Sequence, residues 1–230
     1  MCGISFIIDK KGILDDNPIK KMVLAQGHRG PDVHHNLKQT FPDDSQIFLG
    51  ASRLRISENT PNADQPFFSP DQSSAILFNG EIYNYTELKN ELLKREISFT
   101  TNSDTEVLLQ WIKTFGTTRI SELEGMFAFV YCDFNEGKVI IARDRFGMKP
   151  LYYFENELFI VFSSETRGII ESGLIKKEIN EGQIPYYFNY KYAQPPGTFY
   201  KNINQLPRGC IIQYDHNTLG DPKPFYSPAA

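Results

Sequence analysis

The chain has 230 residues, of which 40% are hydrophobic and 23% are charged, and its formal net charge is −4. This composition is typical of a folded globular protein and argues against disorder. Because no long run of one charge sign and no apolar stretch of roughly 20 residues occurs, the sequence predicts no nucleic-acid stripe, no polybasic membrane helix and no membrane span.

Short apolar segments punctuated by Gly, Pro and Asn predict more strands than helices. The expected strands cover 4–8, 47–56, 75–82, 126–132, 138–143, 151–154, 158–162 and 210–214. The segments DFNEGK and FENE lie between pairs of these strands and predict hairpins, so at least part of the sheet should be antiparallel. A compact domain is expected over 1–190, followed over 191–230 by a proline-rich arm or linker.

Two helices have clear starting signals in the sequence. Asn84, with Glu87 three residues on, precedes an apolar face of leucines, and Ser103 with Glu106 precedes a second apolar face. Gly116 is the expected end of the second helix.

The three cysteines, Cys2, Cys132 and Cys210, are widely spaced and odd in number, which argues against a disulfide framework and a metal site and favours a reducing compartment, the cytoplasm. Removal of Met1 would place a free α-amine on the same residue as the Cys2 thiol. A thiol ordinarily has a pKa near 8.5 and an α-amine about 7.7–8.0, so the amine can accept the thiol proton. The alternative is a half-buried thiol that begins the first strand.

The segment LFNGEIYNY contains candidate donors for an oxyanion. Asn79 offers a side-chain N–H and Gly80 a backbone N–H, and glycine permits close approach of a reacting carbon. An Asn-Gly pair after a strand is also the commonest hairpin signal, so an ordinary turn is the alternative.

Two charged residues are candidates for holding an amino-acid substrate. Arg53, in ASRLRIS, can grip a carboxylate with its planar fork, and Asp104, in SDTE, can hold an ammonium group. Alternatively, Arg53 is a surface residue on a strand, and Asp104 is an acid in the first turn of a capped helix.

Taken in order along the chain, these motifs are more specific than any one of them alone. Cys2 is followed by GHRGPD at 27–32, SRLRI at 52–56, NGEIYNY at 79–85, SDTE at 103–106, LEGMFAFVYCD at 123–133 and ARDRFGMKPLYY at 142–153. This series resembles the glutaminase domain of class II glutamine amidotransferases of the asparagine synthetase type, over nearly the whole chain. The RGPD and RLRIS stretches favour that branch, since the DSAG segment of other branches does not occur.

The resemblance implies the N-terminal-nucleophile hydrolase fold, an α+β, four-layer α-β-β-α sandwich of two antiparallel sheets. It implies that Cys2 attacks the side-chain amide of L-glutamine, forms a thioester and releases ammonia and then glutamate, with Asn79 and Gly80 as the oxyanion hole. Arg53 is expected to bind the α-carboxylate, Glu81 and Asp104 the α-ammonium, and segment 27–32 to shape the loop beside the nucleophile. The remaining pocket residues that it implies are Leu54, Arg55, Ile56 and Ser57.

The resemblance also implies a partner. The released ammonia would pass to an ATP-dependent synthetase domain or subunit, a ligase, and its SGGxDS-like loop does not occur in this chain. The chain is therefore expected to be an excised front half, with no cofactor of its own and with ATP and magnesium bound only by the synthetase domain. A homodimer stays open, and neither nucleic acid nor membrane is an expected partner.

Two alternatives to this function remain. The chain departs from the commonest asparagine synthetase pattern at Arg55 and in SENTPNADQPF, so the acceptor could be a carboxylate other than aspartate, such as that of a surface sugar. A non-catalytic glutamine-binding or docking module of the same fold is the other alternative. Elsewhere, Arg143 to Arg145 are expected to form a buried ion-pair network that braces two strands.

Overall fold

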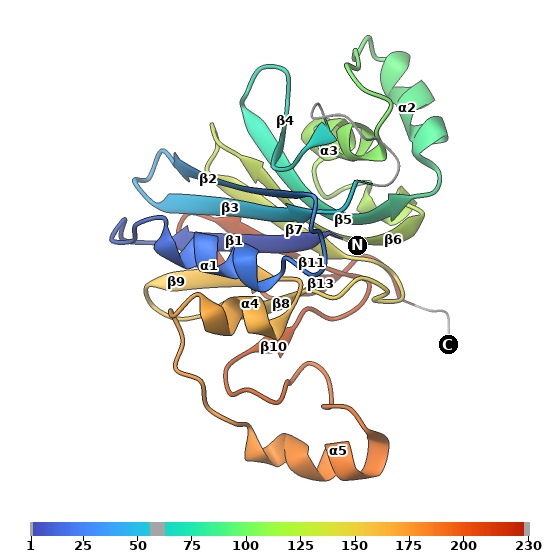
Figure 1. The fold of residues 1–230 in the computed structure, drawn as a ribbon. Helices are drawn as coiled ribbons and strands as arrows, with labels where there is room; N and C mark the ends of the chain where they lie inside the picture. Colours follow the sequence, from blue (N-terminus) through green and yellow to red (C-terminus); the bar gives the residue numbers. More distant parts are fainter. Residues whose placement is uncertain (1, 56–62, 228–230) are drawn as a thin grey trace.

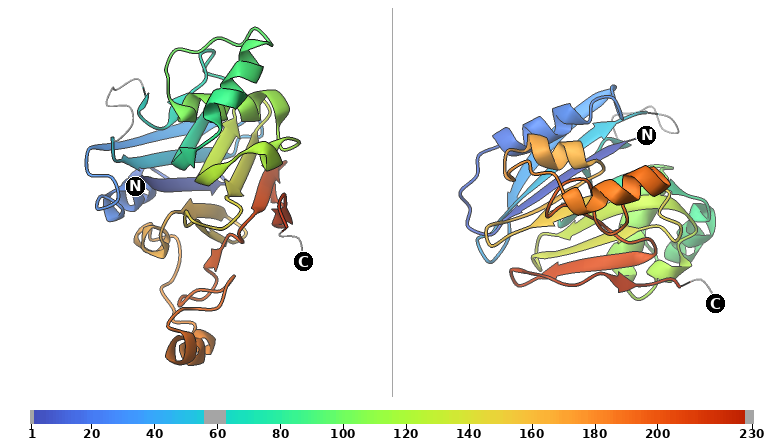
Figure 2. Two further views of the ribbon diagram at one scale, coloured as in Figure 1. Left: turned by 90° about the vertical axis from the view of Figure 1, so that its right-hand side faces the viewer. Right: turned by 90° about the horizontal axis from the view of Figure 1, so that it is seen from below.

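The computed structural model describes residues 2–55 and 63–227. Two antiparallel sheets stack face to face, and helices cover the outer face of each sheet, which gives four layers in the order α-β-β-α (Figures 1 and 2). The expected α+β sandwich is therefore confirmed. Among the described residues, no helix is both long and apolar enough to cross a bilayer.

The first sheet has six strands in the order β10-β8-β9-β1-β3-β2. Its strands are β1 (Gly3–Asp9), β2 (Val33–Thr40), β3 (Gln46–Arg53), β8 (Tyr152–Glu155), β9 (Phe159–Ser163) and β10 (Asn204–Gln205). Strand β1 lies inside this sheet, paired with β3 on one side and β9 on the other, and all seven of its residues are buried. The residue that precedes β1 is therefore attached to one of the most constrained parts of the molecule.

The second sheet runs in the order β12-β11-β7-β6-β5-β4, and β13 also pairs with β11. Its strands are β4 (Phe67–Phe68), β5 (Ser74–Ile82), β6 (Gly125–Asp133), β7 (Lys138–Arg143), β11 (Cys210–Asp215), β12 (Thr218–Leu219) and β13 (Lys223–Pro224). The predicted hairpins are present, because β6 pairs with β7 across DFNEGK and β8 pairs with β9 across FENE.

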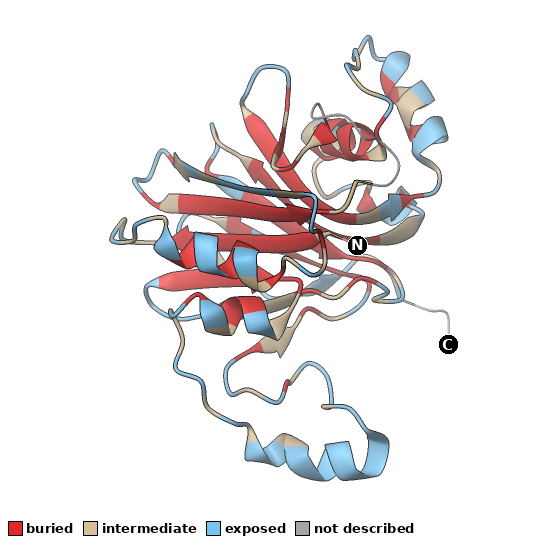
Figure 3. Cartoon of the chain, viewed as in Figure 1, coloured by how far each residue is buried: buried red, intermediate tan, exposed pale blue. Residues whose placement is uncertain are grey.

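Helices α1 (Asn17–Ala25) and α4 (Thr166–Glu171) cover the first sheet, and α2 (Tyr85–Leu93) and α3 (Asp104–Phe115) belong to the layer over the second sheet (Figure 2). The short 3-10 helices are Ile120–Glu122 and Glu181–Gln183, and α5 spans Ile184–Tyr190. Alternation along β1 explains the layers: Phe6 enters the core between the sheets, whereas Ile7 packs with Met22 of α1. Figure 3 shows the interior strands such as β1 and β3 buried and α5 exposed.

Every predicted strand is present, with ends that shift by one or two residues, except that β3 ends at Arg53. The expected extension of this strand to 56 is wrong for residues 54 and 55, and position 56 lies outside the described residues. Strand β2 is missing from the prediction because its sequence, VHHNLKQT, is mostly polar and it lies at a sheet edge with exposed side chains. Its pairing with β3, rather than its own hydrophobicity, makes it a strand.

Helix starts follow the sequence signals in part. Ser103 caps α3 by accepting from the Thr105 backbone N–H, and α3 ends at Gly116, as predicted. Asn84 makes no side-chain cap and instead bonds the backbone of Glu122 and Glu124. Tertiary contacts thus compete successfully for a side chain that could have capped its own helix.

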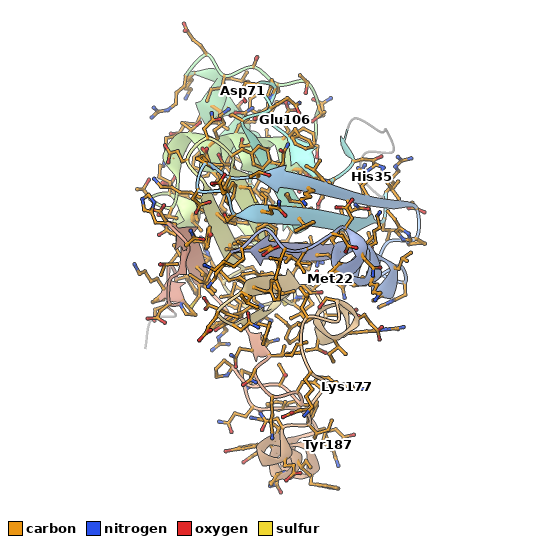
Figure 4. All side chains as sticks on the ribbon, turned by 90° about the vertical axis from the view of Figure 1, so that its left-hand side faces the viewer. Met22, His35, Asp71, Glu106, Lys177 and Tyr187 are labelled. Carbon is orange, nitrogen blue, oxygen red and sulfur yellow. The ribbon has the colours of Figure 1, made fainter. Side chains whose placement is uncertain are left out.

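The segment after α4 leaves the sandwich and returns to it. Figure 4 shows Lys177 and Tyr187 on this projection, away from the sheets, and α5 has no buried residue. The part of the chain expected to be an arm then contributes β10 to the first sheet and β11 to the second, and Tyr214 of β11 is fully buried between the sheets.

Candidate active site

A cavity of about 630 Å³ opens where the start of β1, the end of β3, strand β5 and the start of α3 meet. Its volume is in the range typical of small-molecule sites. Several of the site residues proposed from the sequence line this cavity: Cys2, Arg53, Leu54, Asn79, Gly80, Glu81 and Asp104. Positions distant in the sequence are therefore brought together. Arg55 is not among the lining residues, and Ile56 and Ser57 lie outside the described residues.

Cys2 lies directly before β1 and is half-buried, whereas Cys132 and Cys210 are buried. Burial raises the pKa of the Cys132 and Cys210 thiols and disfavours their thiolate forms. The Cys2 Sγ lies 4.0 Å from the Leu54 carbonyl oxygen and faces the cavity. Of the three thiols, Cys2 is the one placed to meet a ligand.

The Cys2 backbone is held by a side-chain relay from two other parts of the chain. Arg29 Nε donates to the Cys2 carbonyl oxygen at 3.1 Å, and Arg29 Nη1 donates to Glu165 at 3.0 Å. His28 Nε2 lies 2.9 Å from the same Glu165 oxygen. Burial would raise the pKa of Glu165, but the hydrogen bonds from Arg29 and His28 outweigh it and lower that pKa. His28 thus has a structural role, because it helps to hold Glu165.

Asn79 lies inside β5, paired with Ala128 of β6, so the alternative of an Asn-Gly hairpin turn is wrong. Asn79 is 1% exposed, and its Nδ2 has no hydrogen-bond partner among the described residues. An unpaired buried amide N–H costs free energy, and about 90% of buried polar groups in proteins have a hydrogen-bond partner. Since the residue lines the cavity, this donor is placed for a ligand oxygen.

Gly80 follows on the same strand and lies opposite Phe127 of β6. A Cβ at this position would lie 2.2 Å from the Met126 carbonyl oxygen and 2.7 Å from the Phe127 Cα. Both contacts are with backbone, which cannot rotate away. The close approach of β5 and β6 therefore requires glycine here, independently of any ligand.

Among the cavity residues that sequence reasoning missed are two polar ones, Gln65 and Lys149. The Gln65 amide bonds the Phe78 backbone twice, donating to its carbonyl at 2.9 Å and accepting from its N–H at 2.7 Å, and so fixes β5 one residue before Asn79. Lys149 is 8% exposed and places a buried cation on the cavity wall. Neither residue has a local sequence signal, because its role depends on contacts with distant strands.

Carboxylates from β5 and α3 lie on the cavity wall. Asp104 Oδ2 accepts from the Ile82 backbone N–H at 3.0 Å, which links the start of α3 to the end of β5. Burial raises the pKa of Asp104, and the charge of nearby Glu81 adds to this increase. A bound ammonium group would favour the ionised form and so oppose this increase. Glu106, the expected partner in a capping box, instead bonds Thr100 and Thr101.

Besides Lys149, the cavity wall carries the positive group of Arg53, whose side chain is 9% exposed. Its Nη1 donates to Asp64, and Arg55 reaches the same carboxylate with Nε at 3.1 Å and Nη2 at 2.5 Å. The loop at 27–32 supports this strand end. The Arg55 backbone N–H donates to Asp32 Oδ2 at 2.9 Å, and the Asp32 N–H to the Arg53 carbonyl at 3.2 Å.

The prediction of a buried ion-pair network at 143–145 is wrong, because the charged side chains of Arg143 and Asp144 bond backbone groups. Arg143 donates to the backbone carbonyls of Gly147, Lys149 and Leu206, and Asp144 accepts from backbone N–H groups, including that of Lys149 at 3.0 Å. The buried charges therefore shape the loop that carries Lys149 by binding backbone instead of each other.

The cavity thus combines the guanidinium of Arg53, the amine of Lys149, two carboxylates, a thiol and an amide donor that has no partner among the described residues. This set suits a zwitterionic amino acid whose side chain carries a carbonyl group. Among residues 2–55 and 63–227, no group of three or more His, Cys, Asp and Glu side chains is arranged to hold a metal ion.

The family model that describes a glutamine amidotransferase domain matches residues 1–226. The chain is 33% identical to asparagine synthetase (glutamine-hydrolyzing) 1 of Bacillus subtilis, covering 91% of this chain and 33% of that protein. It is 34% identical to amidase chry2 of Gibberella zeae, covering 76% and 27%. It thus spans from about a quarter to about a half of the length of the curated relatives it matches.

A solved structure with a similar fold is the glutamine phosphoribosylpyrophosphate amidotransferase from B. subtilis. The TM-score is 0.67 at 20% identity, and the match covers 98% of this chain and 49% of that chain. At this identity the likeness shows the fold, the expected N-terminal-nucleophile sandwich.

Proposed function

This chain belongs to the family of glutamine amidotransferase domains, and from that premise we propose that it hydrolyses L-glutamine to glutamate and ammonia through a thioester on Cys2. The observation that carries the proposal is the buried Asn79 Nδ2, an amide donor without a partner among the described residues, in the same cavity as the Cys2 thiol. A structural asparagine would have its donor satisfied, whereas an oxyanion hole needs a donor that waits for its ligand.

Substrate orientation follows from the charges of the cavity. Arg53 would bind the α-carboxylate of glutamine, and Asp104 with Glu81 would bind its α-ammonium. The side-chain amide would then lie between Cys2 and Asn79. Desolvated Asp104, whose pKa is raised by burial, gains most from an ammonium partner because the pair relieves the cost of an isolated buried charge.

The first chemical step requires a base for the thiol. After removal of Met1, the α-amine of Cys2 would accept the thiol proton, and the sulfur would bond to the amide carbon of glutamine. The negative charge that develops on the amide oxygen would be stabilised by Asn79 Nδ2 and the Gly80 backbone N–H. The carbon–nitrogen bond then breaks, the α-ammonium returns the proton to the leaving nitrogen, and ammonia departs.

Water completes the cycle. The α-amine would take a proton from a water molecule, whose oxygen attacks the thioester carbon, and the carbon–sulfur bond breaks to release glutamate and the Cys2 thiol. The relay from Arg29 and Glu165 to the Cys2 carbonyl supports the fixed backbone position that both attacks need.

We further propose that the ammonia is delivered to an ATP-dependent synthetase domain or subunit that amidates a carboxylate, as in an asparagine synthetase. The similarity to the B. subtilis asparagine synthetase supports aspartate as the acceptor, and a carboxylate other than aspartate is the alternative. ATP and magnesium would belong to that second domain. Three free thiols suit a reducing compartment such as the cytoplasm.

The test is to measure ammonia and glutamate released from glutamine by the Met1-processed chain. Release is expected from the unsubstituted protein and from Cys132→Ala, and none from Cys2→Ala. A glutamine analogue with an electrophilic carbon should label Cys2 alone, as peptide mapping by mass spectrometry can show. Equal release from Cys2→Ala, or binding of glutamine without turnover, would refute hydrolysis and support a non-catalytic module.

A further inference from the structure

Arg53 is one member of a group of three charged side chains beside the cavity. Asp64 Oδ1 accepts from both Arg53 Nη1 and Arg55 Nε, and Asp64 Oδ2 accepts from Arg55 Nη2 at 2.5 Å. The carboxylate therefore bridges two arginines that stand two residues apart. We call this group, Arg53, Asp64 and Arg55, the arginine bridge.

The arginine bridge is largely shielded from water. The exposed fractions are 9% for the Arg53 side chain, 10% for Asp64 and 24% for Arg55. Burial would raise the pKa of Asp64, but hydrogen bonds from Arg55 and Arg53 outweigh burial and lower it, so the carboxylate stays ionised near neutral pH. Asp32, the other acid near Arg55, is exposed and bonds the Arg55 backbone N–H, so solvent screens its charge.

Charge balance explains why two arginines are needed. Asp64 fixes the Arg53 guanidinium, but its negative charge also cancels the charge that Arg53 would offer to a substrate carboxylate. Arg55 does not line the cavity, yet it returns the group to a net positive charge. A carboxylate approaching Arg53 then meets a fixed guanidinium in a positive field instead of a neutral pair.

We propose that Asp64 and Arg55 are positioning residues for the substrate α-carboxylate: Asp64 holds Arg53 in place, and Arg55 offsets the charge that Asp64 introduces. This inference rests on the proposed glutaminase function and adds to it a determinant of affinity that never touches the substrate. The sequence has no motif for it, because the bridging acid lies 11 residues after Arg53.

The experiment compares glutamine kinetics of Arg55→Gln and the double variant Arg55→Gln/Asp64→Asn. Removing Arg55 alone leaves Arg53 and Asp64 as a neutral pair, so KM for glutamine should rise about 5- to 30-fold with kcat within about twofold. The double variant removes one charge of each sign. Because the asparagine amide oxygen can still accept from Arg53 Nη1 and hold it in place, KM should return to within about threefold of the starting value. Arg119→Gln is the matched control, since Arg119 also joins two carboxylates at 26% side-chain exposure but lies outside the cavity.

A second substrate separates charge recognition from damage to the fold. The substrate 4-aminobutanamide is glutamine without its α-carboxylate and keeps both the amine and the reacting amide. Its kcat/KM should therefore be the same for Arg55→Gln and the unsubstituted chain. An unchanged KM for glutamine in Arg55→Gln, an equal loss with the carboxylate-free amide, or no recovery in the double variant would overturn the inference.

Failure of the proposed function would look different. If the unsubstituted chain released no ammonia, hydrolysis would be refuted, and the same variants would then be titrated with glutamine by calorimetry. Weaker binding by Arg55→Gln with recovery in the double variant would still support the arginine bridge. Equal affinity in all the variants would overturn it.

Discussion

Replacing Asn79 by alanine should separate catalysis from stability. The substitution removes a buried amide whose Nδ2 has no partner among the described residues, so it breaks no donor hydrogen bond of the folded protein. Relief of an unsatisfied buried donor is worth about 1–3 kcal/mol, and the lost packing of the amide offsets it. The midpoint of thermal unfolding should therefore change by less than about 2 °C.

Turnover should respond strongly, because one of the two proposed oxyanion donors is lost. Removal of one such donor typically costs about 10²–10³ in kcat, or about 2.7–4 kcal/mol. KM for glutamine should change much less, since the charged ends of the substrate keep Arg53 and Asp104. The assay is steady-state release of glutamate, paired with thermal unfolding of the same samples.

Asn84→Ala is the matched control for this prediction. Asn84 donates to the Glu122 carbonyl at 2.9 Å and accepts from the Glu124 N–H at 3.0 Å, so its loss should cost about 1–3 kcal/mol of stability, or several degrees, with kcat unchanged. If Asn79→Ala instead unfolds as readily as Asn84→Ala and keeps its kcat, Asn79 is structural and the oxyanion argument is refuted.

Three further outcomes test the neighbouring groups. Asp104→Asn should raise KM for glutamine about 10- to 100-fold through loss of a charge-assisted hydrogen bond. Burial raises the pKa of Asp104 in the folded protein, so its ionised form lowers stability at neutral pH, and this stability returns as pH falls through that pKa. The variant should therefore unfold at an equal or higher temperature at neutral pH and should lose this part of the pH dependence of stability. Gly80→Ala should lower both stability, by about 1–3 kcal/mol, and kcat, because its Cβ meets the backbone of β6 at 2.2 Å; unchanged unfolding would contradict the packing argument. Glu165→Gln should lower kcat about 10-fold, with KM nearly unchanged, by loosening Arg29 and hence Cys2; a pure KM effect would place Glu165 in substrate binding instead.

The sequence predicted the parts of the fold whose signals are local. Alternating apolar residues located the strands that are buried on at least one face, and Ser103 and Gly116 marked both ends of α3. Strand β2 has no such pattern, because edge pairing with β3 determines it. Asn84 misled the capping prediction since two backbone groups near Glu122 compete for its side chain.

For the candidate site, residues within recognisable motifs were predictable and their supports were not. Cys2, Asn79 and Asp104 all line the cavity as expected. Glu165 reaches Arg29 across 136 positions, and Gln65 holds β5 through the backbone of Phe78, so neither contact leaves a spacing in the sequence. Only the folded chain shows which polar residues immobilise the reacting ones.

The placement of the groups separates the proposed reacting groups from those proposed to set the affinity for glutamine. Cys2 is attached to β1, an interior strand whose residues are all buried, and Asn79 is attached to β5, paired along its full length with β6. The groups proposed to grip the ends of glutamine stand instead at a strand end and a helix start, where Arg53 depends on Asp64 and Asp104 on the Ile82 N–H. Changes at Arg53 or Asp104 would alter the affinity for glutamine without moving the Cys2 thiol or the Asn79 amide donor, whereas a change inside the sheets would disturb both.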